Sequence, residues 1–261
     1  MFGLFKRWLR RSKEERPFPP AYTEILDRAV PLARALPEAD QRELERLVLA
    51  FLDEKHFEGA GGFEMTDEAR VTIAAQACIL LLHRDTDIYP DLDTIVVYPS
   101  TYVAPETRHE GPVVIEGDVA RLGESWNRGV VVLAWDAVRR GTADMRDGHN
   151  VVLHEFAHQL DQQDGAMDGA PDLGSRARYA TWARVLGEEY ADLVERVHAG
   201  RPADIDDYGA TSPPEFFAVV TEMFFEQPAQ LQARHPELYD TLADFYQQDP
   251  ASFGSSASSD E

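Results

Sequence analysis

Apolar residues recur at helical spacing over much of the chain. In residues 21–52 they return every three or four positions, as on the buried face of a helix. Residues 69–83 are apolar nearly all round and follow Thr66, a suitable N-cap, so we expect a central buried helix there. The same pattern predicts further helices over residues 151–163, 175–199, 213–226 and 229–247.

Three stretches between these helices have the pattern of β-strands. Residues 94–99, 111–117 and 129–135 are rich in β-branched side chains and are bounded by Gly, Pro and Asp. No internal repeat is visible in the sequence. Because helices come first, then a small sheet, then helices again, we predict an α+β fold that is mostly helical.

Composition narrows the possible partners and the compartment. The chain of 261 residues carries a net charge of −22. This charge argues against nucleic acid as a partner, because binding to its backbone needs clustered Lys and Arg. No apolar run is long enough for a transmembrane helix. The single cysteine, Cys78, cannot form an internal disulfide and lies in an apolar run, so we expect a buried thiol and a cytoplasmic protein.

The two ends of the chain differ from its middle. Residues 1–20 form a basic segment and a linker, in which Lys and Arg are interleaved with Phe, Leu and Trp. Residues 1–15 could rest on an anionic membrane surface. We favour the alternative, a loosely ordered terminus that docks Trp8 on the body of the protein. Residues 251–261 are rich in Ser and are predicted to be a disordered tail.

The stretch HEFAHQLD, residues 154–161, puts polar side chains into a predicted buried helix. Residues four apart lie on one face of a helix, so His154 and His158 can direct both imidazoles at one metal ion. Glu155 lies one position round and can reach a water molecule on that metal without being a ligand. Chance also produces this short pattern, but buried charged groups require a partner. We therefore interpret the stretch as a zinc site.

A catalytic zinc site needs a third protein ligand. His149 lies in the turn before the helix, five residues before the motif, and is expected to face elsewhere. The apolar helix at 213–226 offers two candidates, Glu215 and Glu222, which lie two turns apart on one face. Glu215 also fits a capping box with Ser212, a role that needs no metal. Spacing alone leaves the choice between the two glutamates open.

Two segments together resemble a known family. HEFAHQLD and YGATSPPEFFAVVTEMFF are similar to segments of the Mlc titration factor A family of bacterial zinc peptidases, and GGFEM, IVVYP and FYQQDP extend the resemblance over most of the chain. More remotely, the two segments resemble the catalytic domain of anthrax lethal factor. Both groups are gluzincins, in which a glutamate is the third zinc ligand. The resemblance therefore implies a zincin-like metallopeptidase domain.

Position by position, the resemblance assigns roles to five residues. It implies that His154, His158 and Glu215 bind Zn²⁺. It implies that Glu155 is the general base of peptide hydrolysis. It also implies that the hydroxyl of Tyr208, seven residues before the metal-binding glutamate, donates a hydrogen bond to the oxyanion.

Other residues near these positions have two possible roles each. Glu222 then lies beside the ligands or at the surface. Asp161 follows His158 by three residues on the same face, and it either orients a ligand imidazole or is a surface acid at the helix end.

By analogy with zincins, residues 129–135 are expected to form an edge strand that pairs with the backbone of a peptide substrate.

These expectations give one domain at residues 21–250, with a helical part at 21–90 and a catalytic core at 91–250. The predicted function is that of a zinc-dependent metallopeptidase, which the resemblance implies to be aminopeptidase-like on short peptides. The sequence itself shows no exopeptidase feature. The alternative, which the family's name suggests, is a regulatory protein that binds a transcriptional repressor and has a latent or structural zinc site.

Overall fold

The computed structural model describes residues 16–84, 86–100, 102–110, 113–121, 123–126, 129–144 and 146–253. The basic segment at residues 1–15 and residues 254–261 of the expected tail lie outside these ranges. The expectations for both ends stay predictions, as does the division of the domain at residue 90. None of the helices in these ranges combines the length and the hydropathy that a membrane span requires.

The first helices are shorter than the pattern of apolar residues predicts. In place of one helix over residues 21–52, the structure has α2 Pro20–Ala29, α3 Pro31–Ala35 and α4 Glu38–Glu54. Pro31 opens α3 and Pro37 precedes α4. A proline lacks the N–H that a helix interior needs, so it starts a helix more readily than it continues one.

The buried helix predicted from residue 69 is α5, Asp67–Ile79. It begins as expected, because the hydroxyl of Thr66 accepts a hydrogen bond from Ala69 N at 3.1 Å. From Val71 to Ile79 its residues are buried on all sides, and Cys78 is a buried thiol, as predicted. α5 packs against α4 and forms the centre of the N-terminal part of the core.

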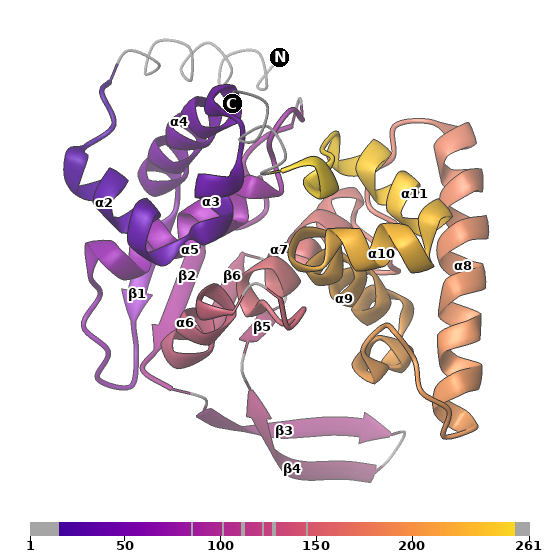
Figure 1. The fold of residues 1–261 in the computed structure, drawn as a ribbon. Coiled ribbons are helices and arrows are strands. Elements are labelled where there is room, and N and C mark those ends of the chain that lie inside the picture. Colours follow the sequence, from indigo (N-terminus) through magenta and orange to yellow (C-terminus); the bar gives the residue numbers. More distant parts are fainter. Residues whose placement is uncertain are drawn as a thin grey trace.

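A four-stranded sheet lies beside these helices (Figure 1). Its order is β1-β2-β6-β5, with β1 His56–Gly59, β2 Thr94–Tyr98, β6 Val130–Ala134 and β5 Gly123–Trp126. β1, β2 and β6 are parallel, whereas β5 pairs antiparallel with β6. The expectation that residues 129–135 form an edge strand is therefore wrong. β5 immediately precedes β6 and folds back along it, so that β5 takes the edge.

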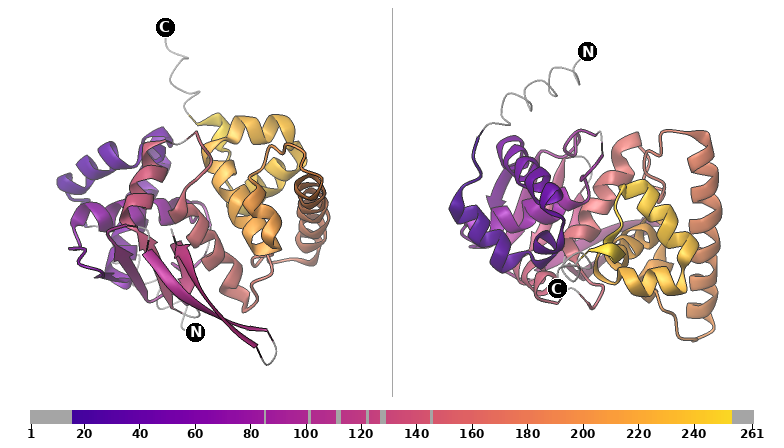
Figure 2. Two further views of the ribbon diagram at one scale, coloured as in Figure 1. Left: turned by 90° about the horizontal axis from the view of Figure 1, so that it is seen from below. Right: turned by 45° about the horizontal axis from the view of Figure 1, so that its top comes forward.

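A separate β-hairpin projects from the body of the molecule (Figures 1 and 2). It consists of β3, Tyr102–Glu110, and β4, Val113–Arg121, which pair antiparallel with Tyr102 opposite Arg121. The sequence predicts only one strand in this region, at residues 111–117. The hairpin forms a two-stranded sheet of its own rather than extending the main sheet.

The C-terminal half consists of helices and short 3₁₀ turns. They are α6 Trp135–Ala143, α7 Val151–Asp161, η1 Gln162–Asp164, α8 Arg176–His198, η2 Asp207–Thr211, α9 Pro213–Glu226, α10 Pro228–Arg234, α11 Pro236–Tyr246 and η3 Pro250–Ser252. The sequence-based prediction lacks α6, which directly follows β6. The helix predicted at 229–247 is two helices, because Pro236 starts a new one. η3 lies where the expected tail begins.

Helix α7 lies between the two halves of the molecule (Figure 1). On one side, the ring of its Phe156 lies 4.8 Å from the ring of Tyr89 and 5.8 Å from that of Phe51, both in the N-terminal part. On the other side, α7 packs along α9. Both sides of α7 are thus covered, and its polar side chains are held at the centre of a mostly helical α+β fold, as predicted.

Candidate metal centre

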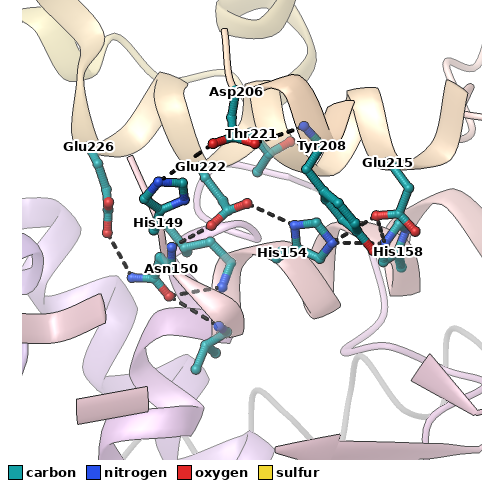
Figure 3. Close-up of polar contacts among 12 residues, drawn as sticks. His149, Asn150, His154, His158, Asp206, Tyr208, Glu215, Thr221, Glu222 and Glu226 are labelled. Carbon is teal, nitrogen blue, oxygen red and sulfur yellow. Dashed lines mark hydrogen bonds and ion pairs between the residues drawn. The ribbon is translucent and has the colours of Figure 1, made fainter. Parts of the chain in front are cut away.

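Asn150 fixes the start of the helix that carries both histidines. Its side-chain Oδ1 accepts hydrogen bonds from Val152 N at 3.1 Å and from Leu153 N at 3.2 Å, so Asn150 is the N-cap of α7. From this start, His154 and His158 lie one turn apart on the face of α7 that meets α9 (Figure 3).

Glu215 comes from the first turn of α9. The hydroxyl of Ser212 accepts a hydrogen bond from Glu215 N at 3.4 Å, so the backbone half of the predicted capping box is present. The Glu215 carboxylate, however, turns toward the imidazoles (Figure 3). Its Oε2 lies 3.0 Å from Nε2 of His154 and 3.3 Å from Nε2 of His158. Capping the helix and meeting the histidines are therefore both roles of this residue.

The three side chains present one ligand atom each to a common point. The two Nε2 atoms of His154 and His158 lie 3.3 Å apart, so all three separations are between 3.0 and 3.3 Å. Atoms that lie 2.0–2.1 Å from one tetrahedral zinc ion would be about 3.3 Å from each other. Two imidazole nitrogens and one carboxylate oxygen are also ligands that zinc accepts. The residues present therefore fit a zinc ion.

Glu222 holds the other nitrogen of His154. Its Oε1 lies 2.7 Å from Nδ1 of that ring, and its Oε2 accepts a hydrogen bond from Asn150 N. Glu222 is buried, so of its two expected positions the one beside the ligands is correct. Both candidate glutamates thus contact His154, and they do so on opposite nitrogens. Only Glu215 also lies beside His158.

Electrostatics favour a positive charge at this point. Burial opposes a charge on His154, but its hydrogen bonds to Glu215 and Glu222 outweigh burial and raise the pKa of the imidazole to about 10. Burial also acts to raise the pKa of Glu215, yet its hydrogen bonds to His154 and His158 lower it to about 2. These carboxylates lie on opposite sides of the His154 ring and therefore stabilise a positive charge on it.

Glu155 and Tyr208 lie beside the three converging side chains. Glu155 is buried, and its charge contributes to the raised pKa of the neighbouring His154. Tyr208 is the second residue of η2, and its ring centroid lies 5.9 Å from that of His154 (Figure 3). Its backbone N donates to Asp206 Oδ1 at 2.8 Å, while 52% of its surface is exposed. A hydroxyl placed in this way can meet a ligand that arrives from solvent.

A second group of metal-binding side chains is present at the surface. Asp40, Glu43 and His83 present ligand atoms within 4.8 Å of one another. His83 forms ordinary ion pairs there, with Nε2 3.2 Å from Asp40 and Nδ1 3.6 Å from Glu43, and Glu43 also accepts its backbone N–H. These contacts account for the group without a metal.

The sequence is similar to known proteins over most of its length. The family described as glucose-regulated metallo-peptidase M90 matches residues 5–247. The chain belongs to this M90 family. An uncharacterized protein of Synechocystis sp. is 44% identical over 245 residues, which are 93% of this chain and 89% of that protein. Mlc titration factor A of Klebsiella pneumoniae (strain 342) is 30% identical over 230 residues, which are 85% of this chain and 84% of that protein.

Membership of the M90 family confirms the resemblance seen in the sequence. Mlc titration factor A of Escherichia coli O7:K1 is also 30% identical, over 231 residues that cover 85% of this chain and 84% of that protein. M90 proteins are metallopeptidases, and the family therefore implies a metal ion. The group formed by His154, His158 and Glu215 is the place in the described structure where α7 and α9 could hold that ion.

Two further residues lie near the candidate metal centre, Asp161 and His149. Asp161 is fully buried, so its reading as a surface acid is wrong. Its two oxygens accept from Gly169 N at 3.0 and 2.9 Å, and burial raises its pKa to about 6. It does not orient His158, whose Nδ1 lacks a hydrogen-bond partner in the described structure. His149 is exposed, 3.7 Å from Asp206, and lies outside the group, as expected.

Sequence reasoning misses two residues that contact the helices of the candidate metal centre. Glu226 is buried, and its Oε1 accepts a hydrogen bond from Asn150 Nδ2 at 3.0 Å. The sequence does contain a signal for Glu226, because a buried acid in a helix as apolar as α9 needs a hydrogen-bond partner. Gly169 has a φ of +81°, and a Cβ there would lie 2.5 Å from Pro213 O, two residues before Glu215. No sequence pattern points to this contact between a loop and α9.

Proposed function

We propose that this M90 family member is a zinc-dependent peptidase in which His154, His158 and Glu215 hold the metal. The observation that carries the proposal is the convergence of three ligand atoms within 3.3 Å of one another, from two packed helices. Among the residues that the structure describes, this group has three members. Three protein ligands are typical of catalytic zinc, whereas a structural zinc site usually has four.

The chain's own residues supply the remaining chemistry. A zinc ion bound at this site would polarise the scissile carbonyl and lower the pKa of a water molecule. Glu155 is the general base: it accepts the proton of the attacking water and delivers it to the leaving amine nitrogen. The Tyr208 hydroxyl donates a hydrogen bond to the oxyanion, and one such donor is worth about 2.7–4 kcal/mol. The burial of Glu155 and the exposure of Tyr208 support these two roles.

We further propose an aminopeptidase-like activity on short peptides. An aminopeptidase needs a carboxylate that binds the free ammonium group of its substrate. Asp206 and Asp207 directly precede Tyr208 and line an open cavity of about 530 Å³. The cavity is not lined by His154, His158, Glu215 or Tyr208, so it is the adjacency of the two acids to Tyr208 in the chain that supports binding of a substrate's amino terminus there.

A second candidate function is regulation by binding. Two relatives are named Mlc titration factor A, a name that gives them the titration of Mlc as their role. The chain could bind a transcriptional repressor in the same way, with a zinc site that is latent or structural. Both functions are proposed for the cytoplasm, where a repressor is present and the thiol of Cys78 stays reduced. The two functions differ in their dependence on Glu155.

Hydrolysis by the wild type beside Glu155→Gln tests the proposal. The panel contains amino-acyl anilides and short peptides, each with a free and with an acetylated amino terminus, and the zinc content of both proteins is measured. We expect turnover by the wild type, a loss of about 10²–10⁴-fold in Glu155→Gln with zinc retained, and a preference for free amino termini. Equal background in both zinc-loaded proteins would refute the peptidase and favour the regulatory protein.

A further inference from the structure

Two glutamates of α9 hold the residue that starts α7. Glu222 and Glu226 are one helical turn apart, and both are buried. Glu222 Oε2 accepts from the backbone N of Asn150, and Glu226 Oε1 accepts from its side-chain Nδ2 at 3.0 Å (Figure 3). The bond from Nδ2 fixes which way the Asn150 amide faces, and it thereby directs Oδ1 to the first N–H groups of α7.

These bonds link the start of α7 directly to α9. α7 carries His154 and His158, and α9 carries Glu215 and Glu222, so the three proposed ligand atoms come from two helices. Ligand positions in a working site must be held to about 0.5 Å. A contact that fixes the end of one helix against the other helix helps to hold the ligand atoms at these positions. Glu226 contributes to it although it touches no proposed ligand.

A small cavity lies beside Glu226. It has a volume of about 10 Å³ and is lined by Val30, Pro31, Leu32, Gln76, Thr142, Asn150 and Glu226. Glu226 Oε2 and Gln76 Oε1 are both buried and have no hydrogen-bond partner among the described residues. The amide of Gln76 is oriented, because its Nε2 donates to Thr72 O at 3.3 Å. Two buried oxygens at one cavity are costly unless a ligand supplies hydrogen bonds.

The size and the chemistry of the cavity fit one water molecule. A water needs about 10–15 Å³ of such volume and two to four polar partners. It can donate one hydrogen bond to Gln76 Oε1 and make a second with the Glu226 carboxyl. Burial raises the pKa of Glu226 to about 8, so this carboxyl keeps its proton at neutral pH and can itself donate to the water.

We propose that Glu226, held by a single buried water shared with Gln76, is a positioning residue for the metal centre. Glu226 acts through Asn150, to which both Glu226 and Glu222 are hydrogen-bonded. It thereby fixes the position of the helix that carries the two histidines. This inference rests on the proposed function, since it takes His154, His158 and Glu215 as the metal ligands.

Zinc affinity of the metal-free full-length protein, measured by competition with a chromophoric chelator, tests the proposal. Glu226→Gln keeps the acceptor for Asn150 and a donor for the water, so its affinity should stay within about threefold of the wild type. Glu226→Met keeps the length of the side chain but neither bond, and it should weaken binding by about tenfold or more. Unchanged affinity in a folded Glu226→Met protein would overturn the proposal.

Thr221→Val is the matched control on the same helix. Thr221 is fully buried, and its hydroxyl shares a hydrogen bond of 2.8 Å with Tyr246 rather than with Asn150. Its loss should lower the thermal midpoint, as Glu226→Met does, and leave zinc affinity unchanged. An equal loss of affinity in Thr221→Val would assign the effect to general destabilisation and refute a positioning role.

Two further measurements keep the outcomes distinct. A crystal structure of the wild type should show one water between Gln76 Oε1 and Glu226 Oε2, and an empty cavity would refute that part of the proposal even if Glu226→Met does not fold. His154→Ala should lose zinc. If the wild type and His154→Ala bind zinc alike, the proposed function fails. If they differ and Glu226→Met matches the wild type, only this inference fails.

Discussion

Nδ1 of His154 lies 2.7 Å from Oε1 of Glu222, while Nε2 of the same ring faces Glu215 and His158. One carboxylate therefore fixes the orientation of the imidazole, and the opposite nitrogen is turned to the point where the three ligand atoms meet. A carboxylate behind a histidine also makes the ring a stronger ligand. The contact between Glu222 and His154 therefore links α9 to α7 next to the proposed metal site.

Replacing Glu222 should weaken metal binding. In Glu222→Gln one carboxylate oxygen becomes an NH₂ group, which must face either the N–H of Asn150 or Nδ1 of His154. One of the two hydrogen bonds is therefore lost. We expect zinc affinity to fall about 10–100-fold, as for other residues that support a ligand. Chelator competition measures this, and a Glu222→Gln protein with wild-type affinity would contradict the orienting role.

The contact between Gly169 and the start of α9 should be sensitive to a single methyl group. Gly169→Ala would place a Cβ 2.5 Å from Pro213 O and move the turn that carries Glu215. Gly174 is the matched control, because its φ is +70° and a Cβ there meets nothing within 4 Å. Gly174→Ala should cost about 1–2 kcal/mol of stability for its backbone conformation alone.

For Gly169→Ala, we expect a larger loss of stability than for the control and a zinc affinity lower by about tenfold or more. Denaturant unfolding and chelator competition measure the two effects. If both glycine variants lose the same stability and keep the same affinity, the loop does not position Glu215.

Glu226 should make stability depend on pH. Burial is the main cause that raises its pKa from 4.5 to about 8, and the charges of Glu222 and Asp147 add to it. Between these two values the folded protein holds a proton that the unfolded chain releases. The free energy of unfolding should therefore fall as pH rises through this window and level off above about pH 8.

Glu226→Gln has no such proton and is the reference for this effect. The thermal midpoint of the wild type relative to Glu226→Gln should decline from about pH 4.5 to about pH 8. Differential scanning calorimetry across this range measures it. A difference that stays constant with pH would mean that the carboxyl of Glu226 titrates near its ordinary value in the fold.

Tyr208→Phe should separate catalysis from stability. The side chain is half-exposed, so its hydroxyl contributes little to folding. Because the hydroxyl is the proposed donor to the oxyanion, its removal should lower kcat by about 10²–10³-fold, with little change in KM. Steady-state kinetics on the best substrate of the panel measure both constants. A Phe variant with wild-type kcat would exclude the hydroxyl from the reaction.

Local patterns in the sequence predict the local structure near the site. The apolar spacing locates α7 and α9, Ser212 is the N-cap that the capping-box pattern indicates, and the motif puts His154 and His158 on one face. The capping-box pattern is correct for the backbone of Glu215 and misleading for its carboxylate. A cap motif specifies hydrogen bonds within one helix, and it says nothing about a second helix that lies opposite.

Contacts between distant segments account for what the sequence does not predict. Helical spacing places Glu222 on the face of Glu215, but the partner of each carboxylate depends on how α9 lies against α7. The bonds from Asn150 to Glu222 and Glu226 span more than seventy residues. The edge position of β5 likewise depends on pairing with β6, which the pattern of either strand alone does not encode.

Anomalous diffraction at the zinc edge from crystals of the zinc-loaded protein tests the central claim most directly. We predict one strong peak bounded by His154 Nε2, His158 Nε2 and a Glu215 oxygen, with the fourth position taken by solvent. A peak at another place, or a fourth protein ligand that closes the site, would contradict a catalytic zinc centre at these three residues.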